Sequence, residues 1–452
     1  MRAFATVWAG QVVSWVGTTA GDFALSLWVY QRTGSVTLLS LTLFCAYLPG
    51  IVAAPFAGVL VDRWDRRRVM LASDLGVALC RLGVLLLLLA GRLELWHIFV
   101  SASVASVLSA VQMPAFYASV TQLVPREHLG RASGMVSFGS AVSHICGPAL
   151  AGVLTAPLGL AGVLMIDFAT FFAAVATLLA VRLPPLPPMA AAATAAEPMW
   201  RAARYGWRYI AARPGLLGLV LFAAMINFNL AMLNALIRPL VLSFSTPAAL
   251  GSVLSATGAG LLVGGLAMGA WGGPRRRIRG ILLGSGVIGV CLAVAGARPS
   301  VLLVGASLFV AYVALAVTSA CFDPIWQSKT PAAVQGRVFA IRVMIRRSCM
   351  PLAYLLAGPL AALFEPLLRS DGALAGSFGG WIGVGPGRGM GLLFIVLGAA
   401  LVAFTTASAF IPSIRYVEDR LPDTAPPREE PDPAAEAETA PGAGAPIPAS
   451  AG

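Results

Sequence analysis

The stretch Gly58-Val-Leu-Val-Asp62-Arg-Trp-Asp65-Arg-Arg-Arg-Val-Met70 concentrates charge in an otherwise apolar chain. Six of the seven residues from Asp62 to Arg68 are charged, whereas charged residues make up 11% of the whole sequence. Arginines hold a loop on the cytoplasmic side of a membrane, but acids contribute little to that orientation. The two aspartates therefore need an explanation of their own, which depends on what lies on either side of the loop.

The flanking sequence is that of a membrane protein. The chain has 452 residues, 58% of them hydrophobic, and a mean hydropathy of +0.84. A membrane-spanning helix needs about 20 mostly apolar residues. By this criterion the sequence predicts an all-α integral membrane protein with twelve transmembrane helices, at 8–30, 37–60, 68–91, 97–122, 132–155, 159–181, 216–240, 249–271, 278–297, 300–324, 336–363 and 390–411.

Charges in the loops predict the orientation. The loops that follow even-numbered spans hold fifteen Arg or Lys residues, and those that follow odd-numbered spans hold five. Because basic residues stay inside, we expect both termini to face the cytoplasm and the protein to lie in the cell membrane. The net charge of +12 does not indicate nucleic acid binding, since the arginines lie mostly in short loops between apolar spans. The first span lacks a cleavage site and is expected to be retained.

The spans divide into four predicted regions. Residues 1–182 form an N-terminal six-helix bundle, and 215–411 form a C-terminal one. Between them, 183–214 is expected to be a cytoplasmic linker whose basic and aromatic residues from Trp200 to Tyr209 form a helix at the membrane surface, with an irregular linker as the alternative. The tail, 412–452, is expected to be disordered, since it is rich in Pro, Ala and Glu.

Three landmarks recur at nearly one offset. Pro125 to Arg131 and Pro331 to Arg337 both read P-x4-G-R, 206 residues apart. The basic runs at 66–68 and 275–277 are 209 apart, and the Gly-Pro pairs at 147–148 and 358–359 are 211 apart. The offset spans six helices, which is an even number, so the two halves are predicted to be parallel-related six-helix bundles.

These features resemble the major facilitator superfamily. The pattern G-x3-D-R-x-[DG]-R-[RK] between helices 2 and 3 matches that family's signature loop, with Asp65 where Gly is more usual. The stretches Trp8–Ser14, Leu27–Tyr30 and Thr33–Ser35 are similar to the branch that contains enterobactin and macrolide exporters. The likeness runs from about residue 3 to 411.

The resemblance implies a gate on the cytoplasmic side. Asp62 ends helix 2 near the predicted start of helix 11, and a carboxylate at a helix N-terminus gains about 0.3–1 kcal/mol. The resemblance implies that this contact latches the two halves in the outward-facing state; the simpler interpretation is that the loop only sets topology. The second copy at 275–279 lacks the acids. The implied gate comprises Gly58, Asp62, Arg63, Asp65, Arg66, Arg67 and Asp74, with Arg342 and Arg346 on helix 11.

Ionised residues inside the spans need a functional or structural explanation, because inserting each one into the membrane costs about 2.5–3.5 kcal/mol of free energy. Asp22 in helix 1 and Asp167 in helix 6 are candidates for proton coupling, since low dielectric favours a protonated carboxylate. For Asp22, a structural hydrogen bond or a position at the outward-facing mouth is the alternative. Asp74 and Arg81 share one face of helix 3 but are too far apart to pair, so we expect each to have a partner on another helix.

Polar residues predict a cavity and a direction of transport. The cavity candidates are Gln11, Arg81, Gln112, Asn227 and Asn234, with interhelical hydrogen bonding as the alternative. His144 is expected to be packed in the core. On helix 5, Gly147, Pro148 and Gly152 resemble the core of a motif typical of the family's exporters, which favours efflux over uptake.

The predicted function is export of a small amphipathic molecule, such as a drug, siderophore or other secondary metabolite, by proton-coupled alternating access. Alternatives are an uptake symporter or lysolipid flippase of the same fold, and a non-transporting sensor or scaffold. An enzyme is not expected, because the sequence lacks a phosphate-binding loop, a metal-ligand cluster and a carboxylate–His constellation. We expect no cofactor and no metal, a proton gradient as energy source, membrane lipids as surroundings and a monomer.

Overall fold

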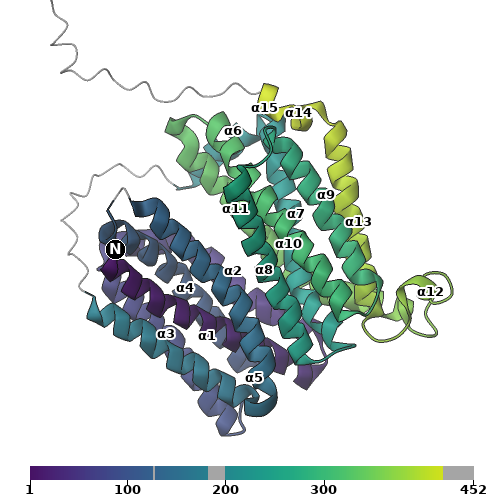
Figure 1. Ribbon diagram of the computed structural model, residues 1–452, viewed down its shortest axis with the longest axis horizontal. Coiled ribbons are helices and arrows are strands. Elements are labelled where there is room, and N and C mark those ends of the chain that lie inside the picture. Colours follow the sequence, from purple (N-terminus) through teal and green to yellow (C-terminus); the bar gives the residue numbers. More distant parts are fainter. Residues whose placement is uncertain (126–127, 182–198, 421–452) are drawn as a thin grey trace, which may run out of the picture.

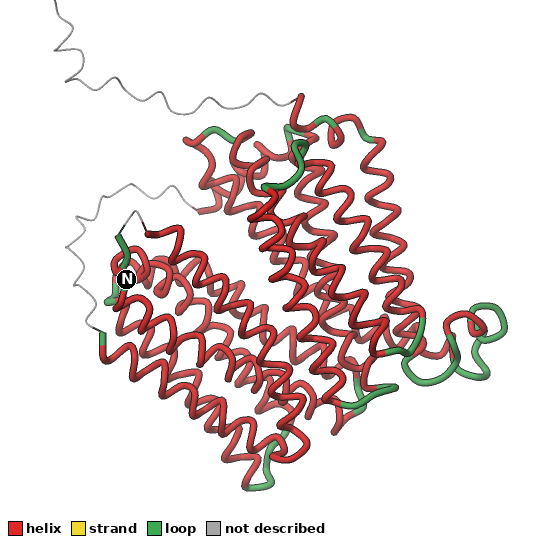
Figure 2. The backbone as a smooth tube through the Cα atoms, viewed as in Figure 1, coloured by secondary structure: helices red, strands yellow, loops and turns green. Residues whose placement is uncertain are grey.

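A computed structural model describes residues 1–125, 128–181 and 199–420. Within these ranges every regular element is a helix, as Figure 2 shows. Eleven of the described helices are long and apolar enough to cross a membrane. This agrees with an all-α membrane protein, and the difference between eleven and the twelve predicted spans has one local cause.

The N-terminal half contains that cause. Its helices are α1 (Arg2–Thr33), α2 (Val36–Arg63), α3 (Arg66–Leu89), α4 (Leu95–Leu123) and α5 (Leu129–Ala180). The 52 residues of α5 would extend roughly 78 Å as one helix, far more than the ~30 Å of a bilayer core. The run instead breaks at Gly159, which has a φ of 63° that favours glycine. It therefore supplies predicted spans 5 and 6, and the half has six crossings.

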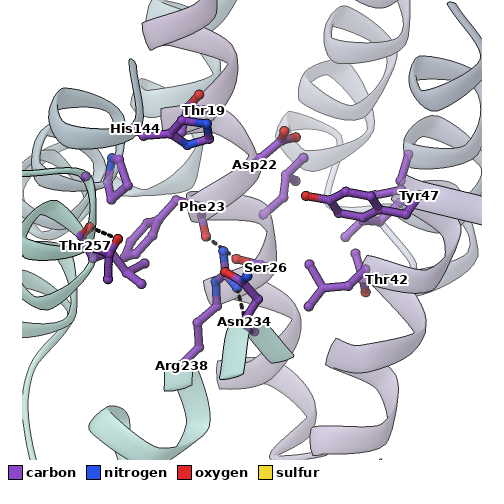
Figure 3. A pocket seen from close by; sticks show the side chains of 18 of the residues that line it. Thr19, Asp22, Phe23, Ser26, Thr42, Tyr47, His144, Asn234, Arg238 and Thr257 are labelled. Atoms are coloured by element: carbon purple, nitrogen blue, oxygen red, sulfur yellow. Dashed lines mark hydrogen bonds between the residues drawn. The ribbon is translucent and has the colours of Figure 1, made fainter. Parts of the chain in front are cut away.

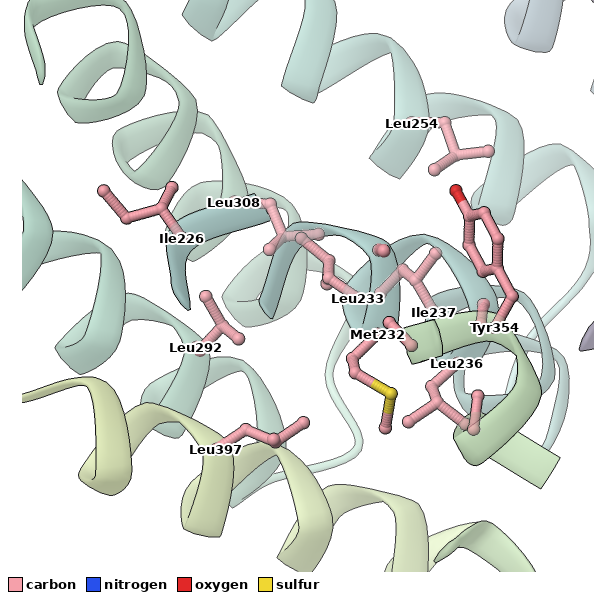
Figure 4. Close-up of a cluster of buried hydrophobic side chains, with 14 of the residues drawn as sticks. Ile226, Met232, Leu233, Leu236, Ile237, Leu254, Leu292, Leu308, Tyr354 and Leu397 are labelled. Atoms are coloured by element: carbon pink, nitrogen blue, oxygen red, sulfur yellow. The ribbon is translucent and has the colours of Figure 1, made fainter. Parts of the chain in front are cut away.

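The C-terminal half is built around one central helix. Its long helices are α7 (Pro214–Leu242), α8 (Pro247–Trp271), α9 (Arg277–Ala297), α10 (Val301–Lys329), α11 (Ala332–Phe364) and α13 (Arg388–Phe410). Figure 4 shows Met232, Leu233 and Leu236 of α7 packed among side chains from the surrounding helices, and all three are almost fully buried. The short η2 (Glu365–Leu368) and α12 (Gly379–Ile382) lie in the loop before α13.

The two halves meet at one end of the molecule. We call the end that holds Met1 and Arg420 the terminal side, and the other the opposite side. Figure 1 shows the purple-to-blue helices and the green-to-yellow helices leaning apart toward the terminal side. On the opposite side, a Cβ added to Gly358 of α11 would lie 2.6 Å from the Cα of Thr37 on α2. The halves are therefore closed on the opposite side and spread on the terminal side.

The segments outside the bundles differ in part from expectation. The linker contains α6 (Met199–Ala211), which packs on α11 and α7; residues 182–198 lie outside the described residues. The prediction that disorder begins at 412 is wrong for its first residues. Pro412–Arg415 form α14 and Val417–Arg420 form α15, because Ile414 and Val417 are buried against the C-terminal half. The rest of the tail, 421–452, lies outside the described residues.

Candidate functional site

A cavity of about 340 Å³ lies between the two halves. Its lining comes from α1 to α5 of the N-terminal half and from α7, α8 and α10 of the C-terminal half. Figure 3 shows Asp22 of α1 with Asn234 and Arg238 of α7 among the side chains around it. A cavity that both halves line changes its shape when the halves move relative to each other, which is what alternating access requires.

Three charged side chains form a cluster on the N-terminal wall. Arg81 of α3 donates a hydrogen bond to Asp22 of α1 and forms an ion pair with Asp167 of α5, with 3.3 Å between Nε and Oδ2. Arg81 and Asp167 are buried, whereas the Asp22 side chain is 63% exposed. Two carboxylates around one guanidinium leave a net charge of −1 when both are ionised. The cluster can therefore accept one proton and become neutral.

Small residues bring these helices together. Gly17 and Gly21 of α1 face α5, and a Cβ added to Gly21 would lie 3.0 Å from the carboxyl carbon of Asp167. Close approach of this kind is the usual role of small residues in membrane helices. Thr18 on the same helix donates to Asp167 at 3.4 Å. The polar cluster thus depends on glycines spaced one turn apart in α1.

A second cavity of about 180 Å³ lies within the N-terminal half beside the cluster. Its lining includes Arg81, Asp167 and Asp74. The placement of Asp74 in the signature-loop network is corrected here. Its carboxylate instead accepts hydrogen bonds from Gln112 of α4 and from Gln11 of α1, the latter at 3.2 Å. Asp74 lies two turns inside α3, so its side chain reaches the interior of the bundle and not the loop.

Arg238 is a cavity residue that was not among the sequence-based candidates. It lies four residues after Asn234 on α7, on the same face, and both line the central cavity. Arg238 donates to the backbone carbonyl of Asn234 at 2.7 Å, but its Nε is buried without a hydrogen-bond partner among the described residues. Tyr47 and Tyr312 line the same cavity. The signal in the sequence is that Arg238 is the one ionised residue in the whole of α7.

The remaining polar candidates separate into two groups. Asn234 and Arg81 line the central cavity, while Gln112 lines the second cavity and Gln11 is buried against Asp74. Asn227 is not among the lining residues of the central cavity and donates to the carbonyl of Ala223. The expectation that His144 is packed in the core is wrong, since it is exposed and lines the central cavity.

The glycines of the exporter-like motif lie where α5 meets its neighbours. A Cβ added to Gly147 would lie 2.7 Å from Cβ of Thr19 on α1. A Cβ on Gly152 would lie 2.9 Å from the carbonyl oxygen of Pro247, at the start of α8 in the other half. Pro148, between them, lines the cavity. Gly152 therefore forms part of the closure on the opposite side.

The signature loop is described only in part. The side chains of Asp62 and Arg63 and the surroundings of Gly58 lie outside the described residues, so the latch stays a prediction. Asp65 caps α3, because its carboxylate accepts from the backbone N–H of Arg68 at 2.9 Å, and Arg67 donates to the carbonyl of Leu179. Arg66 is half-buried.

The expected partners on helix 11 have neighbours within their own half. Arg342 is buried and forms an ion pair with Asp323 of α10, and Arg346 lies half-buried one turn further along α11. Much of the positive charge of Arg342 is therefore already balanced in this conformation.

The described residues contain no group of three or more His, Cys, Asp or Glu side chains that could hold a metal ion. The six cysteines are free thiols, with Cys321 buried and the other five half-buried. Asp22, Arg81, Asp167 and Arg238 are among the ionisable side chains in and beside the central cavity.

Comparison with known proteins agrees with this geometry. The sequence profile of the Major Facilitator Superfamily matches residues 7–354. The chain is 29% identical over 368 residues to macrolide efflux protein A of Streptococcus pyogenes, covering 79% of this chain and 89% of that protein. It is 26% identical over 342 residues to the multidrug efflux pump Tap of Mycolicibacterium fortuitum, covering 74% and 83%.

Solved structures show the same fold. The crystal structure of a bacterial homologue of the human lysosomal transporter Spinster, in an inward-facing and unoccupied conformation, superposes with a TM-score of 0.67 at 15% identity, covering 94% of this chain and 99% of that one. The twelve crossings, the two related halves and the profile match lead to one conclusion: the chain is a multi-pass integral membrane transporter that belongs to the major facilitator superfamily.

Proposed function

We propose that the protein exports a small amphipathic molecule across the cell membrane in exchange for protons. The observation that carries this proposal is the Asp22–Arg81–Asp167 cluster, since it is a proton-accepting group on the wall of a cavity that both halves line. The relatives named for macrolide and multidrug efflux support export of a drug-like molecule. The resemblance of Gly147, Pro148 and Gly152 to the core of an exporter motif supports the same direction.

The basic loops support a cytoplasmic terminal side. With that orientation the halves are spread toward the cytoplasm, and cargo enters the cavity from inside the cell. Ionised Asp22, 63% exposed, attracts a cationic part of the cargo. After the halves rock, a proton from outside reaches the cluster, neutralises it and weakens the hold on the cargo. The halves then return to the conformation that is open to the cytoplasm, at a lower desolvation cost because the cluster is neutral. The proton leaves to the cytoplasm.

Transport into inside-out vesicles tests the proposal. With an imposed pH gradient, wild-type protein is expected to accumulate erythromycin or ethidium, and a protonophore is expected to abolish accumulation. Asp22→Asn removes the exposed carboxylate and should lower gradient-driven accumulation at least about tenfold, the loss of one charge-assisted contact. Asp371→Asn, at an exposed aspartate in the loop between α11 and α13, is the matched control. Accumulation that ignores the gradient, or that survives Asp22→Asn unchanged, contradicts the proposal.

A further inference from the structure

The two arginines of the central cavity have different surroundings. Arg81 has two carboxylates, whereas no described carboxylate forms an ion pair with Arg238. Its one hydrogen bond goes to a backbone carbonyl, and a guanidinium has five N–H donors. The carbonyls at the end of α7 offset part of the cost of the charge. They leave Nε buried and without an acceptor.

Other donors surround Arg238. Tyr47 of α2 and Tyr312 of α10 line the cavity with it and carry hydroxyl groups. The carboxylate that lines this cavity, Asp22, is already bonded to Arg81 on the other wall. Figure 3 shows the side chain of Arg238 extending from α7 into the group of lining side chains. The cavity around Arg238 thus offers hydroxyl groups from both halves, Tyr312 from the C-terminal half and Tyr47 from the N-terminal half. Asp22 is the one carboxylate among its described lining residues.

A guanidinium with a phenol hydroxyl on the same wall fits an anionic oxygen group. A guanidinium binds carboxylate or phosphate with two parallel N–H bonds, and phenol hydroxyls add a third donor. Apolar side chains of the same cavity, among them Phe23, Leu254 and Leu261, fit the hydrophobic part of an amphipathic molecule. The cavity therefore offers a polar contact on each wall together with apolar side chains in its lining.

We infer that Arg238, with Tyr312, forms a subsite for an anionic oxygen group of the cargo, and that the cargo is a zwitterionic amphiphile whose cationic group faces Asp22. The inference rests on the proposed function and adds the substrate class. A molecule held at both ends contacts both halves at once. Its binding energy thus depends on how the halves are placed, which is the condition for coupling binding to rocking.

Binding of three matched fluorescent probes tests the subsite. Ciprofloxacin carries both an amine and a carboxylate, its methyl ester lacks the anion, and N-acetylciprofloxacin lacks the cation. Equilibrium binding to the full-length protein in phosphatidylcholine nanodiscs, without a gradient, is expected to be at least about tenfold tighter for ciprofloxacin than for the ester. Arg238→Gln should remove that preference and leave the affinity for the ester unchanged.

The controls separate charge from structure. Arg238→Lys retains the charge and should retain part of the preference. Arg32→Gln removes an exposed arginine near the same end of the molecule, where it stacks over Trp28, and should leave all three affinities unchanged. Tyr312→Phe removes only a hydroxyl and should weaken ciprofloxacin about threefold, which keeps the test usable if Arg238→Gln does not fold.

The outcomes distinguish this inference from the proposed function. If wild-type protein binds ciprofloxacin and its methyl ester with equal affinity, the subsite assignment is overturned. It is also overturned if Arg238→Gln weakens the binding of both compounds equally. If phosphatidylglycerol in the nanodisc abolishes the preference, a lipid phosphate occupies the site and the assignment to cargo is overturned. Because no gradient is present, a preference that persists in a protein that fails to export supports the subsite and rejects only the export proposal.

Discussion

The two walls of the central cavity carry the same residue type in opposite circumstances. On the N-terminal wall, Arg81 is buried between Asp22 and Asp167, so its charge is balanced within the protein. On the C-terminal wall, Arg238 has a backbone carbonyl and phenols nearby, and no described carboxylate pairs with it. A proton can change the charge of the first wall, whereas only an arriving molecule can balance the second. We infer that both walls contact the cargo and that the N-terminal wall is the one whose charge a proton changes.

The largest effect is expected from breaking the balanced wall. Arg81→Gln leaves Asp167 buried without a cation, and removing one partner of a buried pair costs about 3–5 kcal/mol. We expect a loss of most of the folded protein on heating in detergent, measured by fluorescence-detected size exclusion. Adding Asp167→Asn should restore most of the stability but not transport. Arg92→Gln, at an exposed loop arginine, should have no effect. If adding Asp167→Asn to Arg81→Gln does not restore stability, the claim that Arg81 and Asp167 balance each other's charge is contradicted.

A smaller effect is expected where the two halves meet. Gly152→Val places a side chain against the start of α8, where the Cβ position is 2.9 Å from the Pro247 carbonyl. Overpacking costs about 1–3 kcal/mol, which lowers the equilibrium constant for closure on the opposite side by roughly five- to 150-fold. Spin labels at the exposed positions Arg32 and Arg298, in a cysteine-free background, should report a longer distance across that side.

The control for Gly152→Val is a substitution on α8, the helix that Gly152 contacts. Gly265→Val adds the same side chain at a position with open space beside it and should leave the label distance unchanged. An unchanged distance in Gly152→Val would show that this glycine does not control closure.

The smallest effect is expected where the halves differ in how a helix begins. Asp65 caps α3 from its own loop, whereas α9 is capped by Glu418 of the tail, whose carboxylate accepts from the N–H groups of Arg277 and Ile278 at 3.2 and 3.1 Å. Glu418→Ala should lower the free energy of unfolding by about 0.5–2 kcal/mol, seen as a lower melting temperature with transport retained. Asp419→Ala, which removes an exposed ion pair with Arg276, should change little. Equal melting temperatures of the two variants would contradict the role of Glu418 as the cap of α9.

Local pattern predicts the helices and their pairing in two halves well, because apolar run length and repeated motifs are properties of the sequence itself. Spans 5 and 6 are predicted as separate helices, and α5 does break between them at Gly159. The shape of that turn depends on the backbone of Gly159, with its φ of 63°, which the apolar pattern does not encode. The cap of α9 could not be predicted either, because the second copy of the loop, at 275–279, lacks the acids of the first. Glu418 supplies the cap instead from more than 130 residues away, and no local pattern connects the two positions.

The candidate site was predictable residue by residue but not as an arrangement. Asp22, Arg81 and Asp167 stand out because charge is costly in a membrane, yet their meeting depends on how closely α1 approaches α5 at Gly21. Arg238 was missed because it lies one turn from the end of α7, where an arginine resembles an interfacial anchor. Its spacing of four residues from Asn234 was the available signal.

The most direct test of proton coupling is proton release on cargo binding. Purified wild-type protein in weakly buffered detergent, at a pH where the cluster is ionised only in part, should release protons when ciprofloxacin binds, since cargo and proton compete for the Asp22–Arg81–Asp167 cluster. The number released per molecule bound should equal the protonated fraction of the cluster at that pH, and therefore be less than one. A variant with both Asp22→Asn and Asp167→Asn should release none, at protein concentrations that compensate for weaker binding. Release of the same size from that variant, or binding to the wild type without release, would contradict proton coupling through this cluster.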